Sequence, residues 1–256
     1  MRLPGEGLRV TKTSGAPKRR RDSGWAPYWA PMLAFLLSVE LGGRLPELVQ
    51  PVVFVIKVAA PLGFFVYFLR RGRYPELFGA DWSGGRWLAD VAVGLVGAAL
   101  WMAPFLLWDG LRPDIEGFDP AQLGEDGVAF VLTVRAIGYA GVTPFVEELF
   151  VRSWLIRYIE VFDRRGDFRN RPIAHFSWRS FLVVTLYFVF SHAQWEWGVM
   201  LAWTLLTMAW YYQRGHLAPI VLVHAVTNGA IWAFVVAFDG AFLDSAGRPI
   251  PLWFFL

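Results

Sequence analysis

Long apolar runs separated by short polar stretches dominate the chain. The runs cover residues 28–41, 49–69, 88–108, 128–159, 180–194, 199–212 and 218–238. A helix needs roughly 17–25 residues to cross a bilayer, so the second, third and seventh runs predict membrane helices, whereas the first, fifth and sixth are short. Because helices satisfy their own backbone hydrogen bonds in lipid, we predict an all-α fold, a polytopic transmembrane helical bundle of about seven to eight helices.

The charges between these runs predict how the helices alternate. Residues 1–26 hold seven basic and two acidic side chains, and the segments 70–86 and 163–179 are rich in arginine, whereas residues 109–127 contain six acids and one arginine. Basic segments tend to stay in the cytoplasm, so seven crossings with a cytoplasmic N-terminus fit every loop. We interpret residues 1–26 as a disordered basic cytoplasmic tail, not a nucleic-acid-binding arm, and residues 27–256 as one transmembrane domain.

The composition agrees with a membrane protein. Hydrophobic residues make up 56% of the 256 positions and charged residues 18%, against about 25% charged residues in soluble domains. The absence of cysteine excludes disulfides, thiolate metal sites and cysteine nucleophiles. Arginine strongly outnumbers lysine among the 24 basic residues, a bias typical of GC-rich genomes. We therefore expect a multi-pass protein of a bacterial plasma (inner) membrane.

The fourth run is longer than one crossing requires, and it contains potential helix-breaking residues. Gly138 and Gly141 precede the pair Thr143 and Pro144. Threonine is a suitable N-cap, and proline is favoured at the first position of a helix. We predict a break near residues 141–144 and a new helix that begins at Pro144. Broken helices at membrane depth usually line a cavity.

Three charged residues follow within this apolar run. Each charge near the bilayer centre costs at least about 2.5–3.5 kcal/mol. Glu148 and Arg152 are four residues apart and can pair on one helix face. Glu147 has no partner at that spacing. It lies in the first turn of the predicted helix, where the helix dipole favours its charge and the apolar surroundings oppose it, so it could act as a general base. The alternative is an ion pair that fixes helix register, with Glu147 capped or solvated.

Two of the four histidines, His175 and His216, fall in connecting segments. We expect both to be surface residues. His192 lies near the end of the fifth run and His224 in the middle of the seventh, with Asn228 on the same helix face as His224. A lone intramembrane histidine is usually structural, and asparagine can simply join helices. Two histidines together with a glutamate pair favour a functional site.

A count of helical rise tests whether these residues could meet. From a cytoplasmic boundary at residues 159–161 and 180, Glu147 and His192 both lie roughly 18–20 Å deep. His224 lies shallower, about six residues into its run, so either residues 213–217 dip into the membrane or the boundaries differ. Phe188, four residues before His192, is expected to pack beneath it.

Three short motifs resemble those of a known family. The sequences EELFVR at 147–152, FVFSH at 188–192 and HAVTN at 224–228 resemble the EExxxR, FxxxH and HxxxN motifs of the CAAX protease and bacteriocin-processing (CPBP, Abi) family. This family includes the type II CAAX prenyl endopeptidases. The resemblance covers about residues 128–238, and every motif position is filled in the family's order.

The resemblance implies a glutamate-dependent intramembrane endopeptidase that cleaves a protein or peptide substrate, possibly one anchored in the membrane. Glu147 would be the general base and His192 would help hold the attacking water. His224 and Asn228 would donate to the oxyanion of the tetrahedral intermediate. The supporting motif residues would be Glu148, Arg152 and Phe188. Amide hydrolysis needs such an activated water and such donors.

Other chemistries remain open. Two histidines and a glutamate could bind zinc, but the HExxH spacing is missing and asparagine is a poor zinc ligand, so we expect metal-free catalysis without a cofactor and keep a zinc-dependent membrane protease as the alternative. Ser153 and Ser191 lie near the motifs without a recognisable triad. A non-catalytic immunity or scaffold protein of the same family is a further hypothesis. The last is a transporter with a proton relay, although no internal repeat supports it.

Overall fold

The computed structural model describes residues 24–42, 44–115 and 117–256, and within them the chain is helical and contains no strand. The helices are α1 (Ala26–Gly42), α2 (Gln50–Arg70), α3 (Arg86–Leu107), α4 (Val128–Ala136), α5 (Thr143–Glu148), α6 (Ile156–Val161), α7 (Trp178–Phe190), α8 (Trp197–Arg214) and α9 (Leu217–Phe238). π-helical segments at Ile137–Val142 and Leu149–Leu155 join α4, α5 and α6 into one rod. When this rod of α4, α5 and α6 is counted as one helix, the described part has seven helices, which confirms the predicted all-α bundle. The predicted tail lies almost wholly outside the described residues.

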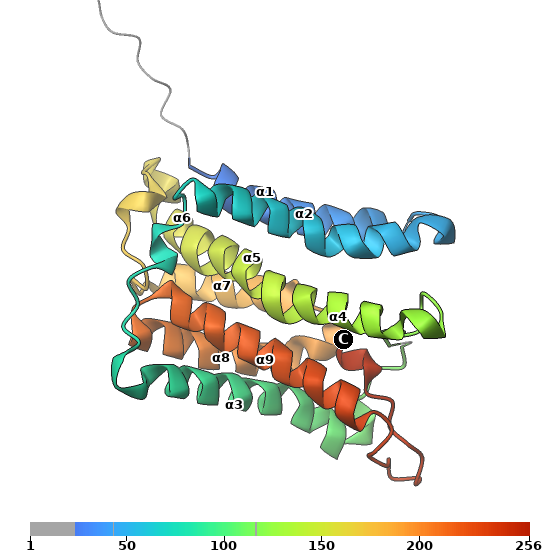
Figure 1. The fold of residues 1–256 in the computed structure, drawn as a ribbon. Coiled ribbons are helices and arrows are strands. Elements are labelled where there is room, and N and C mark those ends of the chain that lie inside the picture. Colours follow the sequence, from blue (N-terminus) through green and yellow to red (C-terminus); the bar gives the residue numbers. More distant parts are fainter. Residues whose placement is uncertain (1–23, 43, 116) are drawn as a thin grey trace, which may run out of the picture.

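The helices lie side by side and alternate in direction (Figure 1). The α1–α2 hairpin packs against one side of the long rod, and α9 and α3 lie on its other side. The start of α1, the segment 70–86 and the segment 162–178 gather at one end of the bundle, whereas residues 109–115 and 117–127 lie at the opposite end. The basic and acidic segments thus separate as the charge pattern predicts.

In the part of the chain that the structure describes, four helical stretches are long and apolar enough to cross a membrane: Gln50–Arg70, Ser83–Leu107, Glu125–Arg164 and Leu217–Phe238. They include the second, third and seventh predicted runs, and α1 and α7 are shorter, as expected. Large side chains on α2 face outward, among them Val52, Ile56 and Phe64. A contiguous apolar surface of this kind is unfavourable in water and suits contact with lipid.

The predicted break at Pro144 is wrong. The backbone stays helical through this region, with φ −88° and ψ −48° at Val142. The turn widens instead, because the Thr143 N–H donates to the carbonyl of Gly138 five residues back. Proline has no N–H, so the next carbonyl, that of Tyr139, receives no donor from the following turn. It also follows that Glu147 lies inside a continuous helix and gains nothing from a helix N-terminus.

A buried polar network fastens the rod at the arginine-rich end of the bundle. The Glu76 carboxylate accepts a hydrogen bond from the Tyr28 hydroxyl at 2.7 Å and another from the Ser153 hydroxyl. Arg157 lies 3.4 Å from the same carboxylate and donates to the Ser153 hydroxyl at 2.6 Å. Ser153 is therefore held in a structural network, which agrees with the absence of a triad around it.

Close packing of α3 against α9 sets the position of the helix that carries His224. A Cβ atom at Gly94 would lie 2.7 Å from the Val226 side chain and 2.8 Å from the carbonyl oxygen of Val223. The Thr227 hydroxyl donates to the carbonyl of Gly94 at 2.9 Å. Glycine is needed here because two helix backbones approach each other directly.

We expect Gly94→Ala to destabilise the protein by about 1–3 kcal/mol, because α3 and α9 must separate to admit the methyl group. Gly63→Ala is the matched control. A Cβ atom there meets nothing within 4 Å, so this change in helix α2 should be neutral or stabilising by about 0.5–1 kcal/mol. Thermal unfolding in detergent compares the two variants. Equal melting temperatures would contradict the close-packing interpretation.

Candidate active site

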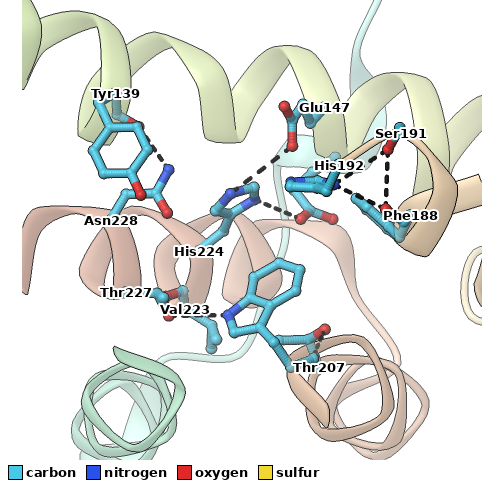
Figure 2. A network of polar contacts seen from close by, with 12 residues as sticks. Tyr139, Glu147, Phe188, Ser191, His192, Thr207, Val223, His224, Thr227 and Asn228 are labelled. Atoms are coloured by element: carbon cyan, nitrogen blue, oxygen red, sulfur yellow. Dashed lines mark hydrogen bonds and ion pairs between the residues drawn. The ribbon is translucent and has the colours of Figure 1, made fainter. Parts of the chain in front are cut away.

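A cavity of about 180 Å³ lies between the long rod, α8, α9 and the turn after α7. Its wall includes Glu147, His192, His224 and Asn228, which come from all three sequence motifs. Figure 2 shows Glu147 and His192 on one side of His224 and Asn228 farther along the same helix. The fold therefore brings together the four residues for which the resemblance implies catalytic roles.

The two adjacent glutamates have different surroundings. The Glu148 side chain is fully buried, and its carboxylate accepts hydrogen bonds from Arg152 and, at 2.8 Å, from Nδ1 of His224. The Glu147 side chain is 18% exposed, and its Oε2 lies 4.0 Å from Nε2 of His224. No hydrogen bond joins the Glu147 carboxylate to another residue of the described ranges. Glu148 is thus fixed between Arg152 and His224, whereas the Glu147 carboxylate is free to bind water in the cavity.

The hydrogen bond to Glu148 determines the protons of His224. A carboxylate only accepts, so Nδ1 of His224 carries a hydrogen. Nε2, which faces Glu147 (Figure 2), is then an acceptor in the neutral ring and a donor in the imidazolium. His224 can therefore present an Nε2–H donor to the cavity only when it is protonated.

The predicted pairing of Glu148 with Arg152 is confirmed, and Arg152 lies at the centre of the core. Its side chain is fully buried and donates to the Thr207 hydroxyl at 2.6 Å. Its guanidinium carbon lies 5.0 Å from the centroid of the Phe188 ring and 5.6 Å from that of Trp203. Phe188 thus packs against the arginine, and its backbone holds His192.

His192 lies outside the helix in which the sequence placed it. Helix α7 ends at Phe190 with Ser191 as its C-cap, so His192 belongs to the following turn. Its Nδ1 donates to the carbonyl oxygen of Phe188 at 2.8 Å, which leaves Nε2 of the neutral ring as an acceptor. The carboxylate of Glu196 accepts a hydrogen bond from the backbone N–H of Ala193 at 3.0 Å and stabilises this turn.

Asn228 is held by the carbonyl group that Pro144 leaves without a donor. Its Nδ2 donates to the carbonyl oxygen of Tyr139 at 2.8 Å (Figure 2). A carboxamide nitrogen has two hydrogens, so one N–H remains for the cavity. The predicted common face of His224 and Asn228 is confirmed, because both line the same wall.

The depth mismatch of His224 has a structural explanation. His224 is only seven residues into α9, about 10 Å of rise, yet it bonds to Glu148, which lies about 20 Å from the end of α6. Along the helices, the start of α9 is therefore nearer to this contact than the end of α6 is. The segment after α2 covers the turn between α8 and α9: Nε2 of His216 donates to the carbonyl of Phe78 at 2.9 Å, and Arg214 donates to that of Asp81 at 2.9 Å.

The other two histidines lie outside the cavity. His216 is hydrogen-bonded in the turn between α8 and α9, and His175 lies 3.1 Å from Glu160.

The side chains around the cavity include residue types that can bind metals, namely histidine and glutamate. Within residues 24–42, 44–115 and 117–256, no group of three histidine, aspartate or glutamate side chains is arranged to hold an ion. Nδ1 of His224 and Nδ1 of His192 both donate to oxygen acceptors.

A comparison with protein families agrees with the resemblance of the motifs. Residues 129–230 match the family described as type II CAAX prenyl endopeptidase Rce1-like. This Rce1-like segment extends from α4 to α9 and contains all seven motif residues, which confirms the resemblance. It supports, at the level of the family, a membrane endopeptidase of the CAAX-protease kind. No curated protein and no solved structure matches the chain.

The Rce1-like segment also contributes side chains that sequence reasoning missed. The Trp203 ring lies 4.8 Å from the His224 ring, and its Nε1 donates weakly to Thr227 at 3.4 Å. Arg135 and Glu196 line the cavity as well. Arg135 and Glu196 are charged residues in or beside apolar runs, a signal that could have identified them, whereas Trp203 is one of 14 tryptophans and has no distinguishing pattern.

Proposed function

We propose that the protein is an intramembrane endopeptidase that hydrolyses a peptide bond in a protein or peptide substrate. The convergence of Glu147, His192, His224 and Asn228 on one cavity carries this proposal. The Glu147 carboxylate takes a proton from a water molecule, whose oxygen attacks the carbonyl carbon of the substrate. The acceptor Nε2 of neutral His192 holds the second hydrogen of that water.

The same geometry supports roles for the remaining groups. The imidazolium N–H of His224 and the free N–H of Asn228 donate to the oxyanion that forms during attack. Glu148 orients His224 through the 2.8 Å hydrogen bond to Nδ1. When the C–N bond breaks, protonated Glu147 returns its proton to the leaving amine, so the carboxylate is regenerated.

We further propose that the arginine-rich end of the bundle faces the cytoplasm and that the protein resides in a bacterial inner membrane. The segments 70–86 and 162–178 at this end carry most of the basic residues of the loops. This distribution follows the positive-inside tendency. The start of α1 lies at the same end.

Mass spectrometry of peptides from membranes that contain the wild-type protein or Glu147→Gln tests the function and finds the substrate. Peptides that end at a common cleavage site should occur with the wild type and be absent with the variant. Identical peptide sets would reject the endopeptidase. Binding of a protein partner that survives changes at Glu147, His192 and His224 would favour an immunity or scaffold role, and proton flux in liposomes would favour a transporter.

A second prediction concerns Pro144, which leaves the Tyr139 carbonyl free for Asn228. Pro144→Ala adds a backbone N–H that can complete the helix, so we expect equal or higher thermal stability. The new donor competes with Asn228 for the carbonyl of Tyr139, and we expect kcat to fall about tenfold as the carboxamide loses its anchor. Thermal unfolding and turnover measured on the same preparation test both effects. A more stable variant with unchanged kcat would show that this anchor is dispensable.

A further inference from the structure

Residues 252–256 reach the candidate active site from outside the Rce1-like segment. The chain folds back after α9 and passes between this helix and α4 (Figure 1). Phe254, Phe255 and Leu256 line the same cavity as Glu147 and His192. The family match ends at residue 230, so this arrangement does not follow from membership of the family.

Two hydrogen bonds fix the ends of this segment. The backbone N–H of Leu252 donates to the Asp239 carboxylate at 2.6 Å. At the other end, Arg135 donates to the backbone oxygen of Leu256. The guanidinium in the cavity wall therefore already binds the chain's own backbone.

The connection between α3 and α4 holds the middle of the segment. The backbone N–H of Phe118 donates to the carbonyl of Trp253 at 3.0 Å. A Cβ atom at Gly117 would lie 2.6 Å from the backbone nitrogen of Phe254. The two backbones are thus in direct contact, and a side chain at position 117 has room only if the segment moves.

The space that remains in the cavity is small for a peptide. Its volume of about 180 Å³ is below the roughly 300–1,000 Å³ of pockets that hold a drug-sized ligand. A second cavity of about 390 Å³ reaches Glu147 from the side of the α1–α2 hairpin, but His192, His224 and Asn228 are not in its wall. A peptide bond within reach of all four residues therefore needs the space that residues 254–256 fill.

We propose that residues 252–256 form an autoinhibitory segment that competes with the peptide substrate for the candidate active site. This inference rests on the proposed peptidase function and adds its regulation. Substrate binds only to the fraction of molecules in which the segment has moved away, so the apparent affinity is reduced by that fraction. Loosening the segment should lower KM and leave kcat unchanged, because none of its residues takes part in the proposed chemistry.

A single methyl group tests the proposal. Gly117→Ala places a Cβ atom against the backbone of the segment and should displace it. Gly110→Ala is the matched control in the same connection, because a Cβ atom there meets nothing within 4 Å. We expect Gly117→Ala to lower KM for the peptide identified by mass spectrometry about tenfold at constant kcat. The control should keep both constants of the wild type.

Cysteine labelling measures the opening of the cavity without catalysis. The chain has no cysteine, so Ile231→Cys introduces a single thiol into the cavity wall. A water-soluble maleimide should modify this thiol about tenfold faster when Gly117→Ala is also present. Val184→Cys is the control for unfolding, because Val184 is fully buried and does not line the cavity. Its labelling should stay slow in both backgrounds.

A peptide with the sequence of residues 251–256 tests whether the segment itself occupies the site. Added to the Ile231→Cys/Gly117→Ala protein in nanodiscs, it should slow the labelling again. The same peptide with both phenylalanines replaced by alanine is the control and should not protect the thiol. Equal effects of the two peptides would contradict a specific occupation of the cavity.

Asp239→Ala serves if thermal unfolding shows that Gly117→Ala does not fold, because it removes the acceptor of the Leu252 N–H. Labelling as slow as in the Gly110→Ala protein would overturn the proposal. Faster labelling with a lower kcat and an unchanged KM would also overturn it, since residues 252–256 would then be a structural wall of the site. Faster labelling of a protein whose wild type cleaves no peptide would show that the segment closes the cavity and would reject only the proposed function.

Discussion

The Glu147→Gln protein is expected to lose at least a factor of about a thousand in kcat for peptide cleavage, within the range that general-base catalysis supplies. An amide cannot take the proton of the attacking water. The carboxylate makes no hydrogen bond to another described residue, and its Oε2 lies 4.0 Å from Nε2 of His224. The fold should therefore lose little, and the melting temperature should stay close to that of the wild type.

The kinetic measurement uses purified protein in nanodiscs and the peptide identified by mass spectrometry. Glu160→Gln is the control, because Glu160 lies on the same rod but pairs with Arg171 and His175 and does not line the cavity. It removes one carboxylate and should leave kcat unchanged. Substantial activity of Glu147→Gln, with normal activity of the control, would remove Glu147 from the mechanism.

Arg152→Met should destabilise the protein by about 3–5 kcal/mol, the usual effect of removing one partner of a buried ion pair. Glu148 would keep only its hydrogen bond with His224, and the Thr207 hydroxyl would lose the hydrogen bond that it accepts from Arg152 at 2.6 Å. Thermal or denaturant unfolding in detergent measures the loss. In Glu148→Gln/Arg152→Met no uncompensated charge remains at these two positions, so the double variant should lose less stability than the sum of the single changes.

The exposed pair Glu40–Arg44 provides a control with the same spacing. Its side chains are 63% and 74% exposed, whereas those of Glu148 and Arg152 are fully buried. We expect Arg44→Met to cost no more than about 0.5 kcal/mol. Comparable losses for Arg44→Met and Arg152→Met would contradict the view that burial, and not spacing, makes the inner pair important.

The apolar runs predict the helices well because burial in lipid demands long apolar segments whatever the details of packing. The run at 218–238 differs from α9 by one residue at its start, and the run at 49–69 differs from α2 by one at each end. Residues spaced four apart on one helix are predictable for the same reason: local geometry alone brings Glu148 to Arg152 and His224 to the face of Asn228.

Contacts between helices were not predictable, because they depend on how the helices pack. Nothing in the sequence places Trp203 against His224 or connects Asn228 to the carbonyl of Tyr139. The break predicted at Pro144 is wrong because a missing N–H allows either a helix break or a widened turn. Only the surrounding helices select the widened turn. His192 fell outside α7 because an apolar run does not mark where a helix ends.

Helix α7 has a consequence for the supply of water to the cavity. Its 13 residues rise about 20 Å, whereas the hydrocarbon layer of a bilayer is about 30 Å thick. Such hydrophobic mismatch is relieved when the lipids thin around a short helix. The headgroup region is thereby drawn toward the turn that carries His192. Hydrolysis consumes one water molecule per peptide bond. Local thinning of the bilayer shortens the path that this water takes through the hydrocarbon layer to the cavity.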